Sequence, residues 1–395
     1  MRCVVFAALI VAACGSPNPG AGPDASGAGG GDGAPSGDAG SSADRDAAPY
    51  APVLNPFGIG LVSPGNATQL DRARELTGRG GHIKLVFAGV DTATTTAPAD
   101  WIAAVNAAYD RELIPVIRLG PPWGNRDVRD DSDDSAHHAY TQLAAHYAAV
   151  VAALPRRDGW PLVIELHNEP DLCYEWACRP EDAPAHDGVP AGWMHYSDIA
   201  AEYAAFMRDV TTAIHAIGDP RILVINGGLA PGGAVTCQCG GDGFTAGITS
   251  RDFLTAMIDA VPGVFDPLDG FASHSYPAQG EGWGFFSAYA DSGPGLHYYQ
   301  TELAILGIDK PVYMTETGWT IADGAHGSRE DVAAWTLSAW QNDWWQQPQI
   351  RAVMPFMLQD PDWDAFGWID AAGNPYPVFT SVRAWRCSMA FPDPC

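Results

Sequence analysis

The chain has 395 residues, and 47% of them are aliphatic, aromatic or cysteine, which is enough for the core of one large domain or two small ones. Its formal net charge is −26, and its two lysines are Lys84 and Lys310. This charge argues against nucleic acid and anionic lipid as partners, whereas neutral sugars suit the 14 tryptophans and 13 tyrosines.

The first 14 residues form the segment MRCVVFAALIVAAC, in which one arginine precedes a short apolar run. This run is too short to span a bilayer as a mature helix, and it is typical of a signal peptide. Residues 11–14 resemble a bacterial lipobox, which implies that Cys14 is acylated and becomes the new N-terminus. A signal peptide cleaved at another position is the alternative.

Residues 15–50 consist almost wholly of glycine, alanine, serine, aspartate and proline. Such a segment cannot bury enough apolar surface to offset its conformational entropy, so the composition predicts a disordered linker. Residues 51–395 are expected to form the main folded domain. This organisation predicts a protein of the cell envelope that meets the membrane only through its N-terminal lipid, at the outer membrane or cell surface, or else a secreted protein.

From residue 57 onward, apolar segments of strand length alternate with segments of helical length and periodicity. In chain order we expect strand 57–63, helix 67–76, strand 82–90, helix 98–110, strand 114–120, helix 135–154, strand 162–166, helix 199–217, strand 221–229, helix 251–260, strand 270–277, a helix within 297–307, a strand within 311–320, a helix after 328, strand 351–358 and helix 378–387. A long insertion, residues 171–196, separates the fourth strand from its helix.

Several helix starts carry their own signals. Proline is tolerated at the first position of a helix, so Pro98 can open the second one. Ser135 can cap the third helix, which is expected to end at Leu154. Ser328 and Asp331 have the spacing of a capping box.

Eight strands that are each followed by a helix predict an α/β protein with a single (β/α)8 barrel. The alternative is an open doubly wound sheet. No glycine-rich phosphate loop follows any predicted strand, so nothing in the sequence supports that alternative.

Six cysteines follow the signal segment, and an even number in an exported chain indicates disulfides. Cys387 and Cys395 are neighbours near the terminus and are expected to pair. Cys237 and Cys239 are one residue apart, a strained span for a mutual bond, so bridges to Cys173 and Cys178 are preferred. A zinc site made from these four cysteines is the alternative, although export favours oxidation.

Two of the predicted strands end in a carboxylate. Glu169 follows the apolar run 162–166 in VIELHNEPDL, and Glu316 closes a second apolar run in PVYMTETGWT. A buried charge is costly unless it is paired, but the mouth of a parallel barrel is where catalytic residues lie. Two carboxylates on strand ends therefore indicate acid–base or nucleophilic chemistry on a glycosidic bond.

These two stretches resemble the clan A retaining glycoside hydrolases, in which an Asn-Glu pair ends the fourth barrel strand and a lone glutamate ends the seventh. The loops are loosely similar to those of families 39 and 5, and the resemblance covers roughly residues 57–386. It implies that Glu169 is the acid/base and Glu316 the nucleophile. One departure is His167, because a tryptophan or glycine more often precedes the Asn-Glu pair in the clan.

The resemblance also implies a set of sugar-binding residues. Asn168 would hydrogen-bond the 2-hydroxyl, the Tyr276 hydroxyl would touch the nucleophile, and His274 would line the subsite. Trp363 matches the position of a stacking platform, and Trp319 is a further candidate. The alternatives are structural: a loop-capping asparagine, a core tyrosine, a satisfied histidine and tryptophans of the loop core. That last alternative also holds for four other tryptophans on the same side, Trp123, Trp176, Trp193 and Trp283.

Arg118 lies among apolar residues in the third predicted strand, and the resemblance loosely places it in the substrate site. A buried cation needs an anion, which Glu316 or Glu165 could supply. Lys84 is the competing cation. Because Glu165 lies four residues before Glu169 and has the same strand parity, we interpret it as a structural partner.

No metal and no cofactor are expected. The acidic run between residues 127 and 134 invites comparison with a calcium site, but it lacks the spacing and the glycine of an EF-hand loop, and a solvated loop is the simpler interpretation.

The resulting prediction is a retaining O-glycoside hydrolase that cleaves a β-linked poly- or oligosaccharide by double displacement and acts as a monomer. One alternative is a non-catalytic carbohydrate-binding or scaffold lipoprotein that keeps the barrel. Another is a transglycosylase that uses the same residues. Both glutamates at strand ends favour an enzyme, whereas the identity of the sugar depends on loops, which the fold does not determine.

Overall fold

The structure is a computed structural model that describes residues 55–121, 139–171, 175–176, 193–230, 236–238, 250–277, 294–321, 327–389 and 395. The predicted signal segment, the linker and the acidic run 127–134 lie outside these ranges. No helix in the described part of the chain is long and apolar enough to cross a membrane.

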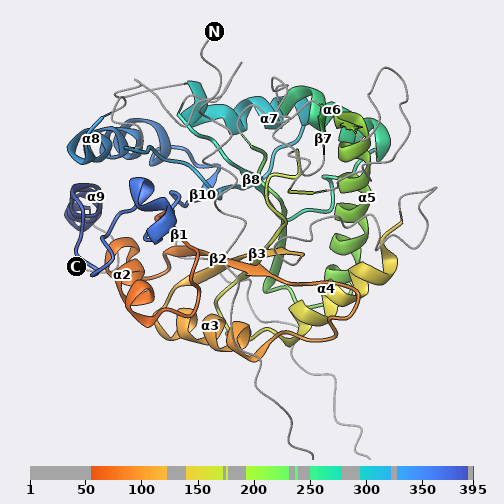
Figure 1. Cartoon of the computed structure of the whole chain (residues 1–395), viewed down its shortest axis with the longest axis horizontal. Helices are drawn as coiled ribbons and strands as arrows, with labels where there is room; N and C mark the ends of the chain where they lie inside the picture. Colours follow the sequence, from red (N-terminus) through yellow and green to blue (C-terminus); the bar gives the residue numbers. More distant parts are fainter. Residues whose placement is uncertain are drawn as a thin grey trace, which may run out of the picture.

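Eight parallel strands of the described chain are arranged in two arcs around a common centre (Figure 1). The larger arc has the order β1-β2-β3-β4-β6, the smaller one has the order β10-β9-β8, and single parallel bridges join them at Phe57–Val353 and Ile225–Gly270. The fold is therefore an α/β fold of the (β/α)8 class. The strands are β1 (Gly58–Leu61), β2 (His82–Ala88), β3 (Ile114–Gly120), β4 (Leu162–Leu166), β6 (Ile222–Asn226), β8 (Phe271–Ser273), β9 (Val312–Met314) and β10 (Ile350–Val353).

Helices surround the strands on the outside, in the order of the chain (Figure 1). Each predicted helix is present, with ends that differ by a few residues. They are α2 (Ala67–Thr77), α3 (Ala99–Asp110), α4 (Thr141–Ala153), α5 (Tyr196–His215), α6 (Ser250–Ala260), α7 (Tyr298–Leu306), α8 (Arg329–Ala339) and α9 (Pro377–Ser388). Shorter turns are η3 (Pro294–His297), η4 (Trp340–Trp344) and η5 (Pro361–Phe366).

The helix-capping predictions have different outcomes. The capping box of α8 is confirmed: Ser328 accepts from the Asp331 backbone N–H at 3.2 Å, and Asp331 accepts from the Ser328 N–H at 2.8 Å. The Ser135 cap is wrong, because α4 begins only at Thr141 and its N-cap residue is Tyr140. Tyr140 supplies no capping side chain. The helix start therefore had no local signal to predict it.

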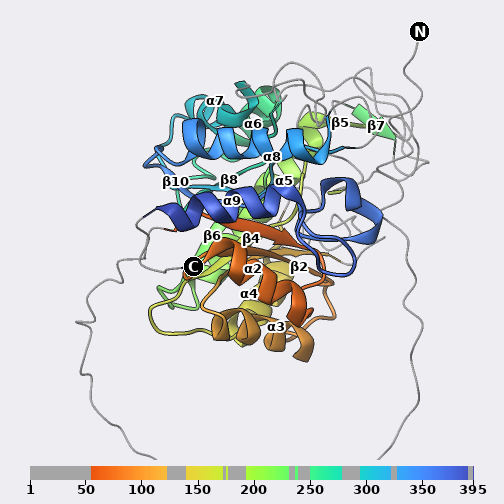
Figure 2. The same ribbon diagram turned by 90° about the vertical axis from the view of Figure 1, so that its left-hand side faces the viewer.

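The insertion after β4 contributes an element that sequence patterns did not predict. Residues Trp193–His195 form β5, which pairs with β7 (Thr236–Gln238) in a two-stranded antiparallel sheet. Strands of three residues are too short to show a hydrophobic period. Figure 2 shows this small sheet at the same end of the barrel as the segment that leads into α9.

The barrel interior holds a layer of apolar side chains with charged side chains above it. The apolar layer consists of Ile114, Val116, Val163, Ile225, Ala272, Tyr313, Ala352 and Met354. Because side chains alternate along a strand, Arg118 and Glu165 follow Val116 and Val163 on the inner face, two residues nearer the carboxyl end. Along the barrel axis, the apolar layer is thus followed by a charged layer, which lies at the mouth of the barrel.

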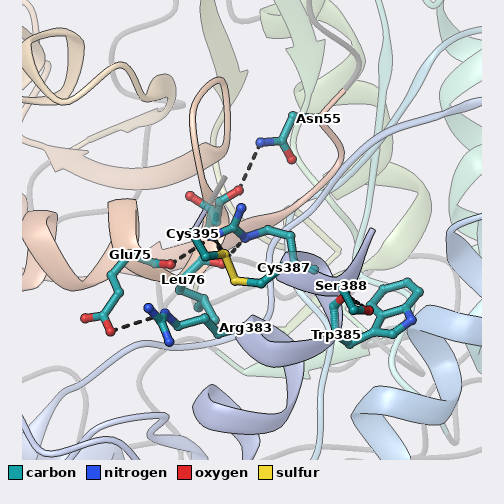
Figure 3. Close-up of a disulfide and its surroundings, with 10 residues drawn as sticks. Asn55, Glu75, Leu76, Arg383, Trp385, Cys387, Ser388 and Cys395 are labelled. Atoms are coloured by element: carbon teal, nitrogen blue, oxygen red, sulfur yellow. Dashed lines mark hydrogen bonds and ion pairs between the residues drawn. A yellow bond between two sulfur atoms is a disulfide. The ribbon is translucent and has the colours of Figure 1, made fainter. Parts of the chain in front are cut away.

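Side chains of the C-terminal helix α9 contact the first helix, α2. Cys387 and Cys395 form a disulfide, as predicted, and beside it Arg383 pairs with Glu75 of α2 at 3.3 Å (Figure 3). The buried Arg386 Nε donates to the Leu76 carbonyl at 2.8 Å, which satisfies one of the free carbonyls at the end of α2. The pairing of Cys173, Cys178, Cys237 and Cys239 stays a prediction, because their side chains lie outside the described part of the chain.

Candidate active site

The two glutamates that follow β4 and β9 meet at the mouth of the barrel. Single ligand atoms of Glu169, Glu316 and His274 all lie within 4.8 Å of one another. Both glutamate side chains are largely enclosed, with 14% of Glu169 and 13% of Glu316 exposed. β9 ends at Met314 and β8 at Ser273, so Glu316 and His274 lie just beyond the last strand residues.

The backbone that presents Glu169 is strained. His167 and Glu169 have φ values of +78° and +40°, in the left-handed region that side-chain-bearing residues rarely occupy. Such a conformation costs on the order of 1–3 kcal/mol per residue and persists only where surrounding contacts impose it. One such contact is the hydrogen bond from the Glu169 N–H to the Gly228 carbonyl, at 2.9 Å.

Glu316 is surrounded by groups that favour its ionised form. The Lys84 ammonium lies 2.9 Å from Oε1, and the Tyr276 hydroxyl donates to Oε2 at 3.1 Å, which is the contact expected for Tyr276. Burial alone would raise the pKa of Glu316. The charges of His274 and Lys84 outweigh burial and lower the pKa from 4.5 to about 2. Glu316 is therefore a carboxylate at neutral pH.

Lys84 also pairs with Glu165, at 3.2 Å, and both side chains are almost wholly buried. Burial raises the pKa of Glu165, yet the charge of Lys84 brings it below its usual value. Of the two cations that the sequence offered for these anions, Lys84 is thus the one in contact with both. Arg118 pairs instead with Glu175 of the insertion, at 3.5 Å, a partner that sequence reasoning missed because the insertion has no periodic pattern.

His274 lies between the two strand-end glutamates and is completely buried. Its Nδ1 is 3.0 Å from Glu169 Oε1 and 3.8 Å from Glu316 Oε2. Burial lowers the pKa of His274, but the charge of Glu316 and the contacts with Glu165 and Glu169 raise it to about 9, despite the opposing charge of Lys84.

Gly228 is a further site residue that sequence reasoning missed. A Cβ at this position would lie 2.2 Å from Cδ2 of His274, so only glycine lets the histidine ring approach the backbone. The Gly228 N–H points at Glu165 Oε1 at 3.4 Å, and its carbonyl accepts from Glu169. The sequence signal that could have identified Gly228 was the Gly227-Gly228 pair near the end of the apolar run 221–229.

Two polar residues beside Glu169 are buried with it. Asn168 is 7% exposed, and its Oδ1 has no hydrogen-bond partner in the described structure, which is compatible with a ligand contact. Asp171, also missed, accepts from the Ala230 N–H at 2.8 Å. Burial raises the pKa of Asp171 well above its usual value, so the enclosed site favours its protonated form.

The candidate tryptophans differ in their surroundings. Trp363, in η5, is partly exposed, and its ring lies 5.7 Å from that of Phe356. Trp319 is 3% exposed and packs against Trp335 and Trp344, a burial that favours the loop-core interpretation over a stacking surface for a sugar. Trp176 is likewise fully buried, whereas the side chains of Trp123, Trp193 and Trp283 lie outside the described part of the chain.

The group of Glu169, His274 and Glu316 has enough ligand atoms for a metal ion. However, the Lys84 ammonium already lies 2.9 Å from Glu316, and a cation beside it would be repelled. The arrangement is better suited to chemistry between two carboxylates, one of them ionised and held by a lysine and a tyrosine.

Comparisons with known proteins identify the fold. No family model and no curated protein matches the sequence. Among solved structures, a GH39 enzyme from Xanthomonas axonopodis pv. citri aligns with a TM-score of 0.53 and 17% identity over 85% of this chain and 67% of its own. A monomeric beta-xylosidase from Caulobacter crescentus aligns at 0.52 and 17% over 84% and 68% of the two chains. An endo-beta-1,4-glucanase from Xanthomonas axonopodis pv. citri, a triple mutant, aligns at 0.51 and 13% over 84% and 98%. The barrel is thus the fold of these glycoside hydrolases.

Proposed function

We propose that the protein is a retaining O-glycoside hydrolase that cleaves a β-linked poly- or oligosaccharide. The observation that carries this proposal is the meeting of Glu169 and Glu316, whose nearest oxygens come within 4.8 Å at the mouth of the barrel. Retaining glycosidases hold their two carboxyl groups about 5–5.5 Å apart, whereas inverting enzymes separate them by about 6.5–9.5 Å to admit a water molecule.

Glu316 is the nucleophile in this mechanism. Its ionised form is stabilised by Lys84 and Tyr276, which contact different oxygens of the carboxylate. A carboxylate that is ionised at neutral pH can attack the anomeric carbon and form a glycosyl ester. The Tyr276 hydrogen bond orients the attacking group within the enclosed site.

Glu169 is the acid/base. In the first step it donates a proton to the leaving oxygen while Glu316 forms the ester bond. The ester has no charge, so the like-charge repulsion between the two groups disappears and Glu169 is stable as a carboxylate. In the second step Glu169 takes a proton from water, whose oxygen displaces Glu316 from the anomeric carbon.

The remaining candidates complete a subsite around the reacting bond. The buried Asn168 amide supplies a polar group for the 2-hydroxyl, and Trp363 supplies a partly exposed ring for stacking. Arg118, next to Glu175, lies in the same charged layer of the barrel. The beta-xylosidase and the endo-beta-1,4-glucanase that share the fold support a β-linked substrate.

A screen of aryl β-glycosides and β-linked polysaccharides tests the proposal. We expect hydrolysis of at least one substrate, with the β-anomer as the first product in proton NMR. The double variant Glu169→Gln/Glu316→Gln serves as the inactive control from the same preparation. An α-anomeric first product would refute the retaining mechanism, and equal rates for the wild type and the double variant would refute the assignment of this site.

A further inference from the structure

The two ring nitrogens of His274 lie within ion-pair distance of three carboxylates, Glu165, Glu169 and Glu316. Nδ1 faces the catalytic pair, at 3.0 Å from Glu169 Oε1 and 3.8 Å from Glu316 Oε2. Nε2 lies 3.5 Å from the Lys84 ammonium and 3.7 Å from Glu165 Oε1, so the Glu165 carboxylate stands beside both nitrogens. Lys84 contacts two of these three carboxylates, Glu165 and Glu316.

The ring cannot easily leave this position. Gly228 packs against the ring so closely that a Cβ there would lie 2.2 Å from Cδ2, and the ring is completely buried. On the Nε2 side, the Glu165 carboxylate lies between two nitrogens, with Oε2 at 3.2 Å from Lys84 and Oε1 at 3.7 Å from His274. Glu165 is therefore placed to balance two cations at once.

The charged and titratable groups in and around the barrel mouth near His274 come from several elements of the fold. They are Lys84 of β2, Arg118 of β3, Glu165 and Glu169 of β4 or its end, Asp171 beyond β4, Tyr276 after β8, Glu316 after β9 and Glu302 of α7 behind the wall of the barrel.

We propose that His274 is an imidazolium that serves the two catalytic carboxylates in turn, neutralising Glu316 before the attack and Glu169 after the proton has been donated. This inference rests on the proposed double displacement. His274 is then a positioning residue that acts through both glutamates and keeps its own proton throughout the cycle.

The charge balance of the reaction fits this role. When Glu316 forms its bond to the anomeric carbon, one negative charge is lost beside Nδ1. In the same step the Glu169 proton moves to the leaving oxygen, and one negative charge appears 3.0 Å from the same nitrogen. The reverse exchange accompanies deglycosylation. His274 thus faces one carboxylate at each stage, and the buried site never has to hold an uncompensated charge.

The pKa of His274 agrees with this geometry. Burial alone would lower the pKa of His274, and the charge of Glu316 is the largest influence that raises it, to about 9. The same reasoning extends to the ester form, in which Glu169 would replace Glu316 as the neighbouring anion. Without either anion, Glu165 would be the remaining group that raises the pKa of His274, and we expect burial and the charge of Lys84 to outweigh it and favour the neutral ring.

Nitrogen-15 NMR of labelled histidine can test the proposal without a substrate. His274 is assigned among the 11 histidines by the signal that disappears in His274→Gln. At pH 7 we expect imidazolium shifts for His274 in the wild type, in Glu316→Gln and in Glu169→Gln. In the double variant Glu169→Gln/Glu316→Gln we expect the shifts of a neutral ring. Each glutamine keeps the shape of the side chain and removes only its charge.

Each outcome decides the matter. A neutral ring in the wild type or in either single variant overturns the proposal, because His274 would then depend on one carboxylate or on none. An imidazolium in the double variant also overturns it, because Glu165 alone would then hold the charge. If circular dichroism shows that the double variant is unfolded, Glu169→Asn/Glu316→Asn replaces it. If the glycosidase screen fails while this pattern is found, the charge coupling stands and only the proposed reaction is lost.

A kinetic arm applies once a substrate is known. Loss of the cation in His274→Gln should move both limbs of the pH profile of kcat/KM to higher pH, since both carboxylates lose their counterion. Tyr276→Phe is the matched control, because its hydroxyl hydrogen-bonds Glu316, and only the acid limb should move. A uniform loss of rate with no movement of either limb in His274→Gln would reduce the residue to a structural role.

Discussion

The Lys84 ammonium lies 2.9 Å from Oε1 of Glu316, the group that we assign as the nucleophile. Together with the charge of His274, this contact explains how a carboxylate with only 13% of its side chain exposed can stay ionised, with its pKa at about 2. Lys84 of β2 thus helps to keep Glu316 ionised through one carboxylate oxygen, while the Tyr276 hydroxyl donates to the other.

Replacing Lys84 by methionine should therefore raise the pKa of Glu316. We expect the acid limb of the kcat/KM profile to move to higher pH, because the nucleophile would be protonated over part of the working range. Lys84→Arg keeps the positive charge and should leave the acid limb near its original position. A pH–rate series on one substrate checks both variants, and equal acid limbs in the two would show that the lysine charge has no part in ionising Glu316.

The same substitution has an effect on stability. Lys84→Met leaves Glu165 buried without its nearer cation, and breaking such a pair typically costs about 3–5 kcal/mol. Adding Glu165→Gln removes the stranded charge, so the double variant should unfold at a higher urea concentration than Lys84→Met alone. This comparison separates the structural role of the pair from its influence on the nucleophile.

The eight strands could be predicted because strands covered by helices read as apolar runs, and their carboxyl ends in a parallel barrel meet at one mouth. That rule alone led from the sequence to the meeting of Glu169 with Glu316. The partner of Arg118 could not be predicted in the same way, because Glu175 lies in an insertion without periodicity. The contact of Gly228 with His274 joins two strand ends 46 residues apart in the numbering, and no spacing rule encodes it.

Gly228→Ala adds only one methyl group, but we expect it to disturb the active site strongly. The new methyl group would lie 2.2 Å from Cδ2 of His274, so the ring or the backbone that holds Glu169 must move. A displacement of about 1 Å can cost about 10²-fold in rate, and we expect a loss of this order in kcat/KM. Gly65→Ala, at an exposed loop position with nothing within 4 Å of the new Cβ, is the control and should keep full activity.

Glu302 of α7 is a buried carboxyl behind the barrel wall, where it accepts a hydrogen bond from Ser273 at 2.5 Å. Burial raises its pKa from 4.5 to about 7. The folded protein therefore keeps the proton where the unfolded chain loses it, so stability falls as the pH rises from 4.5 towards 7 and stays reduced above that. One pKa unit corresponds to about 1.4 kcal/mol, so the ionised group costs on the order of 3 kcal/mol at pH 8.

Glu302→Gln removes this cost and can still accept from Ser273. We expect its melting temperature to exceed that of the wild type at pH 8 and to approach it near pH 4.5. Glu330→Gln, at an exposed position of α8, is the matched control and should show no such pH-dependent difference. A constant difference at both pH values would mean that the gain does not come from ionisation.

We propose that the protein is anchored by a lipid on Cys14, with residues 15–50 as a tether. A random coil of this length has an end-to-end distance of about 30 Å, which would let the barrel reach glycan beyond the lipid surface. Cell fractionation of the wild type and Cys14→Ser should show membrane association only in the wild type. Cys3→Ser, within the same segment, should behave like the wild type. Equal solubility of the wild type and Cys14→Ser would refute the lipid anchor on Cys14.

The roles of the two glutamates can be separated by azide. Glu316→Ala lacks the nucleophile of both steps and should be nearly inactive on every substrate. Glu169→Ala lacks only the proton donor and base, so its loss, about 10²- to 10⁴-fold, should be largest for poor leaving groups and small for activated aryl glycosides. Because azide needs no base, it should accelerate the slow deglycosylation of Glu169→Ala and give a glycosyl azide of retained configuration. A glycosyl azide of inverted configuration from Glu169→Ala, together with one of retained configuration from Glu316→Ala, would show that the two roles are exchanged. Unimpaired hydrolysis in both variants would show that neither glutamate is catalytic.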